Sequence, residues 1–179
     1  CASGIAIVTV DELGENSIVV SSGANLQFEP ARIAECTSCI ENSDILLIQL
    51  EIPLETVEVA LQVARKADVQ TILDPAPVTQ AYLNYDIYGV DVICPNQIEA
   101  EILTGITVHN PNDAIRASER LMELGAKNAI VTLSSQGTVI HNGRRPHFIE
   151  PYSVAAVDST AAGDAFTGAF SVKFVETGC

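Results

Sequence analysis

Residues 159–164, near the carboxyl end of the chain, are the part of the sequence best suited to chemistry. Ala161, Ala162 and Gly163 carry almost no side chain, so a helix that begins here leaves its first backbone N–H groups accessible to a ligand. Those donors, together with the positive end of the helix dipole, favour a phosphate or a developing anion. Asp164 adds a carboxylate in the first helical turn. The residue types therefore indicate an anion site beside a group that can accept a proton.

A purely structural interpretation of the same residues is also open. Ser159 or Thr160 could cap the helix, and Asp164 could simply interact with its dipole. A second segment offers a similar choice, because Asn96 and Glu99 have the spacing of a capping box. A helix start directly after a strand is also where phosphates bind, so the two roles of Asn96 and Glu99 are compatible.

Strand and helix patterns alternate from residue 44 to residue 133, which predicts a parallel sheet with crossover helices. The continuous apolar run at residues 44–50 is typical of a strand covered on both faces. Open α/β sheets bind their ligands at the carboxyl ends of the strands. Glu51 is expected at such an end, although a loop carboxylate on the surface is the more common fate of a Glu.

Other segments complete the predicted order of elements. The helix at the carboxyl end is expected to be buried, because two sets of apolar residues recur in it at helical spacing. Short antiparallel strands or hairpins are predicted at residues 4–10, 17–20, 137–141, 145–149 and 152–157. A helix is expected to open at Pro30, as an N1 proline, and another at Pro111.

The composition excludes several classes of protein. The chain has 179 residues, 47% of them hydrophobic, and a formal net charge of −14, so a nucleic-acid surface is not expected. No apolar run approaches the roughly 18 residues of a membrane helix. Five scattered cysteines indicate a reducing compartment, the cytoplasm. Dinucleotide and P-loop glycine motifs are absent from the sequence, so residues 161–163 are the best candidate for handling phosphate.

Residues 157–168 resemble the second signature of the ribokinase-like, or phosphofructokinase-B, carbohydrate kinases. That signature reads Asp-Thr-x-x-Ala-Gly-Asp followed by an aromatic residue and a Gly, and Ser159 replaces its usual Thr. Residues 49–53, 95–105 and 132–137 are also similar to family segments, in the same order. The resemblance implies an α/β fold, a ribokinase-like three-layer α/β/α sandwich with a mostly parallel central sheet, here incomplete. Residues 1–179 are then the core portion of a single kinase domain, and the ends of the sequence suggest a piece of a longer protein.

The resemblance also implies roles for individual residues. Asp164 would take the proton from a sugar hydroxyl as that hydroxyl attacks the γ-phosphorus of ATP. Backbone N–H groups in the run Ala161, Ala162, Gly163 and Asp164 would hold the charge that builds on the transferring phosphoryl group. Glu51 would contact the sugar together with Asp164.

Nucleotide and metal sites follow from the same resemblance. The residues expected to contact the nucleotide are Asn96, Thr132, Ser134, Gly137 and Gly163. Ser134 stands where the family usually has Gly, and its Cβ could narrow the approach of a phosphate or a ribose. Glu99 would support Mg²⁺ through water, while Asp158 and the Thr160 carbonyl would bind a monovalent cation, K⁺.

The implied activity is phosphoryl transfer from ATP to a sugar hydroxyl, with D-ribose as the first candidate acceptor and ribose 5-phosphate as the product. The alternatives are a fructokinase or a nucleoside kinase of the same family, or a nucleotide-binding fragment without activity. The expected partners are a small sugar and ATP, with no nucleic acid and no membrane, and the full-length protein could form a homodimer.

Overall fold

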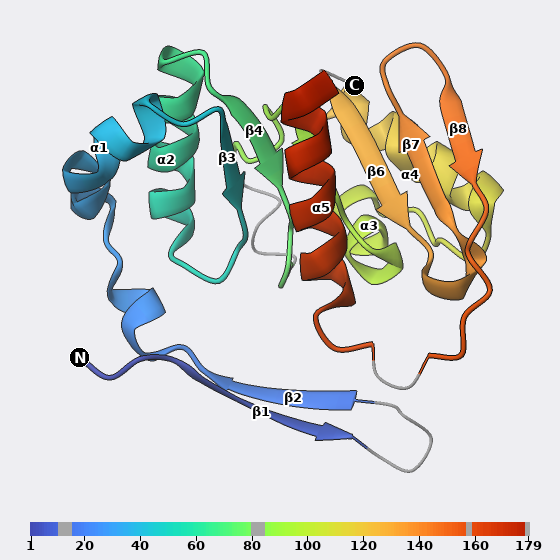
Figure 1. Ribbon diagram of the computed structural model, residues 1–179, viewed down its shortest axis with the longest axis horizontal. Helices are drawn as coiled ribbons and strands as arrows, with labels where there is room; N and C mark the ends of the chain where they lie inside the picture. The colour runs from blue at the N-terminus through green and yellow to red at the C-terminus, as the bar shows by residue number, and fades with distance from the viewer. Residues whose placement is uncertain (11–15, 80–84, 157–158, 178–179) are drawn as a thin grey trace.

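The computed structural model describes residues 1–10, 16–79, 85–156 and 159–177. Its centre is a six-stranded sheet in the order β3-β4-β5-β6-β7-β8. The first four strands run parallel, and the last two are antiparallel additions at one edge (Figure 1). The strands are β3 Ile45–Ile48, β4 Gln70–Leu73, β5 Val92–Ile93, β6 Asn128–Thr132, β7 Thr138–His141 and β8 Pro146–Ile149.

One face of the sheet is covered by helices that follow the parallel strands. Apolar residues of β4, β5 and β6, such as Leu73, Ile93 and Val131, pack with Leu61 and Leu121 in the larger core. Full burial of each such side chain stabilises the fold by about 1.5–3 kcal/mol. The helices associated with this core are α1 Ile33–Glu41, α2 Leu54–Lys66, α3 Gln97–Thr104 and α4 Pro111–Glu123.

The other face is covered by α5, Ala162–Thr177, which lies in front of the sheet in Figure 1. Neighbouring residues on a strand point to opposite faces, so Ile72, Val92 and Ile130 alternate with the residues above and pack with Phe174 of α5. The arrangement has three layers, helices, mostly parallel sheet and helix, as the sequence predicts.

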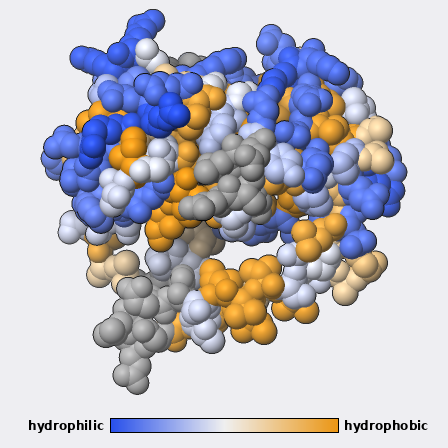
Figure 2. Space-filling view, turned by 180° about the vertical axis from the view of Figure 1, so that it is seen from behind, coloured by the Kyte–Doolittle hydropathy of each residue, from blue (hydrophilic) through white to orange (hydrophobic). Residues whose placement is uncertain are grey.

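A separate two-stranded hairpin lies across the end of the sheet where α5 begins (Figure 1). Its strands, β1 Ile5–Val10 and β2 Asn16–Ser21, pair antiparallel and bear exposed apolar side chains. Figure 2 shows this hydrophobic surface at the lower end of the molecule. The short helices η1 Gly23–Gln27 and η2 Pro30–Arg32 connect the hairpin to α1.

Four predictions about elements are wrong. Residues 152–156 form no strand, because no described strand lies beyond β8 to pair with them, and Tyr152 is 93% exposed. The α5 helix is buried along one side only, and Val172 is 63% exposed, because the sheet covers just that side. Leu47 of β3 is 41% exposed, so this strand is not covered on both faces. Pro30 opens the short helix η2 rather than α1 itself.

Within the described ranges, no helix has both the length and the hydropathy that crossing a bilayer requires.

Candidate active site

Polar residues follow each of the parallel strands at one edge of the sheet. Gln49 comes directly after β3, Asp74 directly after β4, and Asn96 shortly after β5, while Thr132 is the last residue of β6. A single β-bridge joins Asn96 to Thr132. Because carboxyl ends of parallel strands share one edge, four segments that are distant in sequence deliver polar groups to the same place.

The start of α5 completes a cavity at this edge with a volume of about 310 Å³. It receives residues from β2, from the ends of β4, β5 and β6, and from the turn before α5. Most residues predicted for catalysis, nucleotide binding and metal binding line it: Asn96, Glu99, Thr132, Thr160, Ala161, Ala162, Gly163 and Asp164. Ser134 and Gly137, both predicted to contact the nucleotide, do not line it.

In the turn before α5, one of the backbone N–H groups expected to be open to a ligand is already hydrogen-bonded within the protein. The N–H of Ala162 already donates to the carbonyl of Ser159 at 3.1 Å, so it is not available to a ligand in this conformation. Ala161 has φ +59°, a left-handed backbone that costs a residue with a Cβ about 1–2 kcal/mol. Hydrogen bonds between described residues engage neither the Gly163 N–H nor the Asp164 N–H. These two groups remain as the donors at the helix start.

Gly163 stands in open space. A Cβ placed at this position meets no atom within 4 Å, so packing does not require a glycine here. The missing side chain leaves the N–H groups of the first turn accessible from the cavity, as a bound anion needs.

Asp164 is exposed, and its carboxylate is anchored by one hydrogen bond. The amide Nε2 of Gln49 donates to Asp164 Oδ1 at 3.1 Å. The carboxylate lines the 310 Å³ cavity and also a neighbouring cavity, about 360 Å³ in volume, that lies toward Leu47 and Gln49. Asp164 is therefore held at one oxygen while its side chain borders the cavity that the α5 N–H groups face.

Asp74 is a buried carboxyl behind Asp164, with 7% of its surface exposed. Burial raises the pKa of Asp74, the charge of Asp164 raises it further, and contacts with Thr167 and Gln49 act in the opposite direction. Thr167 Oγ1 lies 3.3 Å from Asp74 Oδ2 and 2.9 Å from the carbonyl oxygen of Gly163. A hydroxyl has one proton to donate, so a protonated Asp74 allows both contacts to be hydrogen bonds.

Cys94 lies beside the same cluster, with its sulfur 3.9 Å from Thr167 Oγ1. Burial raises the pKa of this thiol to about 12, and the charge of Asp74 adds to that effect. The thiol is therefore neutral at physiological pH and fills space rather than acting as a nucleophile.

Asn96 and Glu99 form the predicted capping box at the start of α3. Asn96 Oδ1 accepts from the Glu99 N–H at 3.0 Å, and Glu99 Oε2 accepts from the Asn96 N–H at 2.8 Å. Burial raises the pKa of Glu99, and the hydrogen bond from the Asn96 backbone opposes it. Both residues still line the cavity, so the cap and a ligand contact can coexist.

The cavity is negative and suits an Mg²⁺–phosphate ligand better than a bare phosphate. Its lining carries the carboxylates of Asp74, Glu99 and Asp164 and neither Lys nor Arg. Elsewhere in the described residues, as here, no cluster of three His, Cys, Asp or Glu side chains could coordinate a metal directly. Mg²⁺ retains several waters and binds through few carboxylates plus phosphate oxygens, which fits Glu99 as a ligand through water. Asp158, predicted for the monovalent cation with Thr160, lies outside the described residues.

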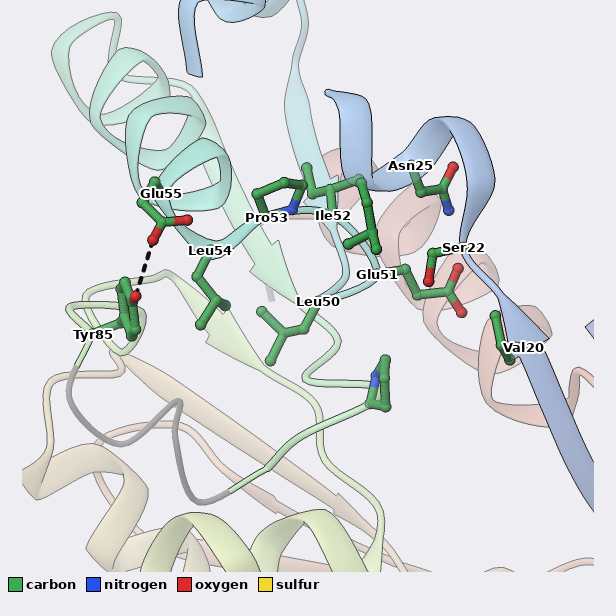
Figure 3. Close-up of a pocket in the computed structure, with 12 residues that line it drawn as sticks. Val20, Ser22, Asn25, Leu50, Glu51, Ile52, Pro53, Leu54, Glu55 and Tyr85 are labelled. Atoms are coloured by element: carbon green, nitrogen blue, oxygen red, sulfur yellow. Dashed lines mark hydrogen bonds between the residues drawn. The ribbon is translucent and has the colours of Figure 1, made fainter. Parts of the chain in front are cut away.

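A third cavity, also about 360 Å³ in volume, contains Glu51 (Figure 3). Ser22, Asn25 and Glu51 provide its polar groups near Val20, while Tyr85 donates to Glu55 across its other end at 3.0 Å. The structure thus places Glu51 and Asp164 in different cavities, and two consecutive residues, Pro77 and Ala76, line one each.

Two residues of the turn after β6, Ser134 and Gly137, have a positive φ. Ser134 has φ +52°, a left-handed conformation that suits the glycine usual in the family better than a serine. Gly137 has φ +102°, and a Cβ there would collide with the carbonyl oxygen of Ile149 and the ring of Phe148. Gly137 is therefore required by the close approach of β8.

The prediction from sequence missed Gln49, Asp74 and Thr167. Gln49 and Asp74 each follow a parallel strand directly, which was the available signal. The role of Thr167 depends on α5 packing against β4 and β5, which no local pattern reveals.

The sequence pattern of the pfkB family of carbohydrate kinases matches residues 1–178, and the chain belongs to this family. It is 37% identical to the ribokinase of Haemophilus influenzae over 174 residues, which are 97% of this chain and 56% of that protein. Its identity to the deoxyribokinase of Salmonella typhi is 34% over 178 residues, covering 99% of this chain and 58% of the relative. The chain thus spans about half the length of these curated relatives.

Solved structures agree with the fold. The structure of Arabidopsis thaliana ribokinase complexed with ribose and ATP superposes with a TM-score of 0.83 at 31% identity, covering 97% of this chain and 57% of that one. The predicted family and the predicted ribokinase-like fold class are confirmed.

Replacing Ser134 with Gly should stabilise the protein by roughly 0.5–1 kcal/mol, because the left-handed backbone no longer carries a Cβ. Gly137→Ala is the matched opposite change in the same turn and should destabilise by more than about 2 kcal/mol, because the new Cβ meets β8. Urea unfolding of both variants measures the two effects. A destabilised Ser134→Gly variant contradicts the strain assigned to this residue.

Asp74→Asn should stabilise the protein at pH 7 by on the order of 1 kcal/mol, because it removes a buried charge near Asp164. The pKa of Asp74 is raised in the folded state above its ordinary 3.8. Below pH 3.8, where Asp74 is protonated, the folded wild type therefore has the full stability that this group contributes. It loses this stability as the pH rises through the raised pKa. Unfolding free energies from pH 3 to pH 8 should show the gain of the variant appearing only toward higher pH. An equal gain at every pH contradicts the assignment.

Proposed function

We propose that the protein is an ATP-dependent sugar kinase that transfers the γ-phosphoryl group of ATP to a hydroxyl of D-ribose. The observation that carries the proposal is the start of α5, where the Gly163 and Asp164 N–H groups open into a cavity beside the Asp164 carboxylate. The ribokinase and deoxyribokinase relatives, which act on pentoses by their names, supply the candidate acceptors.

The two adjoining cavities suit the two reactants. The sugar occupies the cavity of Glu51, where a carboxylate, the Asn25 amide and the Ser22 hydroxyl can pair with several sugar hydroxyls. The triphosphate occupies the cavity of Asp164. Consecutive residues, Ala76 and Pro77, line the two cavities, which supports a placement in which a sugar hydroxyl in one cavity faces the phosphoryl group in the other.

Asp164 acts as the general base. Phosphoryl transfer depends mainly on positioning and on stabilising charge, together with a group that receives the proton of the attacking hydroxyl. Asp164 accepts that proton, while the N–H groups of Gly163 and of Asp164 itself hold the charge on the transferred phosphoryl oxygens. The Ala162 N–H joins them only if the turn releases its bond to Ser159.

Asn96, Thr132, Ser134 and Gly137 line the path of the nucleotide. Asn96 and Thr132 belong to the phosphate cavity. Ser134 and Gly137 lie in the turn that follows β6, close in sequence to Thr132, and would contact the nucleoside.

Glu99 holds Mg²⁺ through water. The ion, when bound with ATP, neutralises phosphate charge that the three carboxylates of the cavity would otherwise repel. Asp158 and the Thr160 carbonyl would contribute ligands to a site for a monovalent cation, K⁺.

The setting of the enzyme is the cytoplasm, which the acidic composition and the five cysteines support. A homodimer is supported by the exposed apolar side chains of the hairpin, such as Ile7 and Val19, which are 61% and 67% exposed.

Asp164→Asn in the full-length protein should lower kcat about 10²–10⁴-fold, because the amide cannot accept the proton. Affinity for ATP should change little. ADP release with ribose, 2-deoxyribose, fructose and a nucleoside measures turnover and ranks the acceptors, and calorimetry measures ATP binding. Asp44→Asn, an exposed acid at the other end of β3, is the control. Equal turnover in the two variants rules out Asp164 as the base.

Gly163→Ala should fold as stably as the wild type, because its methyl group meets no protein atom within 4 Å. That methyl group occupies the approach to the helix N–H donors, so kcat with ATP should fall at least about tenfold. Gly168→Ala is the matched control, since its Cβ is equally unhindered on the same helix but lies outside the cavity lining. Equal activity of the two alanine variants argues against phosphate binding at this turn.

A further inference from the structure

Gln49 connects the end of β3 to the first turn of α5. Its amide Nε2 donates to Asp164 Oδ1 at 3.1 Å, joining residues 115 positions apart in the sequence. Among the described residues, Gln49 is the side chain that donates a hydrogen bond to the Asp164 carboxylate. Gln49 is half-buried at the end of β3, whereas Asp164 is exposed. Gln49 is therefore the more restrained partner in this hydrogen bond.

The same side chain lies near two carboxyl groups. Gln49, Asp74, Asp164 and Thr167 line one cavity with Leu47. Interaction with Gln49 lowers the pKa of Asp74, against the effects of burial and of the Asp164 charge. A primary amide has two N–H donors, so one side chain can address both carboxyl groups.

Asp164 needs such an anchor for orientation. It projects from the first turn of a helix whose start is open, and its neighbours Ala161, Ala162 and Gly163 offer no side chain to restrict its rotation. A misplacement of about 1 Å in a reacting group can cost about 10²-fold in rate. A hydrogen bond at Oδ1 restricts the carboxylate and leaves Oδ2 for the acceptor hydroxyl.

A neutral donor suits this position better than a cation. An Arg or Lys beside a carboxylate lowers its pKa by about 1–3 units and so weakens it as a proton acceptor. An amide orients the carboxylate with a much smaller penalty of this kind.

We propose that Gln49 is a positioning residue for phosphoryl transfer: its side-chain amide fixes the Asp164 carboxylate toward the acceptor hydroxyl. The proposal rests on the function proposed above for Asp164.

The first test of the role of Gln49 is the Gln49→Leu variant of the full-length protein. We expect kcat to fall about 10- to 100-fold while KM for ATP and for ribose stays within about twofold, because binding groups are unchanged. Gln70→Leu is the matched control, a half-buried glutamine at the amino end of the neighbouring strand β4, and should keep wild-type kcat. A kcat for Gln49→Leu within about twofold of the control overturns the proposal.

Gln49→Glu separates positioning from a structural role. A carboxyl group of the same size donates to Asp164 only when it is protonated and repels it when ionised. The ratio of variant to wild-type kcat should therefore rise as the pH falls from 8 to 5. A ratio independent of pH overturns the proposal, since a purely structural loss does not vary in this way.

A measurement without turnover distinguishes failure of this inference from failure of the proposed function. The ¹³C resonance of the Asp164 carboxyl is compared at pH 7 in the wild type and in Gln49→Leu. Loss of the hydrogen bond at Oδ1 should shift this resonance in the variant, whereas Gln70→Leu should leave it in place. An unshifted resonance overturns the role of Gln49 even if the kinase is active, whereas a shifted resonance in a protein that phosphorylates no sugar removes the kinase function alone.

Discussion

The candidate site depends on the packing of α5 against the middle of the parallel sheet. Ile72, Val92 and Ile130 point to the same face and fix the helix through Phe174, while the parallel direction of β3 to β6 brings their carboxyl ends to one edge. The first turn of α5 meets that edge because the apolar contacts along its buried side determine where the helix lies. Side chains that never touch the ligand thus set the position of the N–H donors.

Charge is the second constraint on this edge of the sheet. Asp74, Glu99 and Asp164 border one cavity without a cation among its lining residues, and burial raises the pKa of both Asp74 and Glu99. Such a surface repels a bare phosphate, and a positively charged ion would offset that repulsion. The neutral contacts from Gln49, Thr167 and the Asn96 backbone hold the carboxyl groups apart without adding that charge.

The sequence predicted the parts of this architecture that local patterns encode. Strand-helix alternation gave the parallel sheet, and the spacing of Asn96 and Glu99 gave the capping box. Small residues before Asp164 indicated the open helix start. The bond from Ala162 to Ser159 and the left-handed Ala161 depend on how one turn closes, which residue types do not determine. Burial of α5 was overestimated because its apolar residues surround the helix while the described sheet covers one side. The roles of Gln49 and Asp74 depend on contacts with Asp164 and Thr167, which lie 115 and 93 positions away in the sequence.

The hairpin has a consequence for how the two cavities respond to ligands. Ile18 and Val20 lie two residues apart on β2 and therefore on one face, Ile18 bordering the cavity of Asp164 and Val20 that of Glu51. Both side chains belong to one short strand, so a displacement of β2 would change the lining of both cavities. Any coupling that this produced between occupants of the two cavities would be reciprocal, each altering the affinity for the other by the same factor.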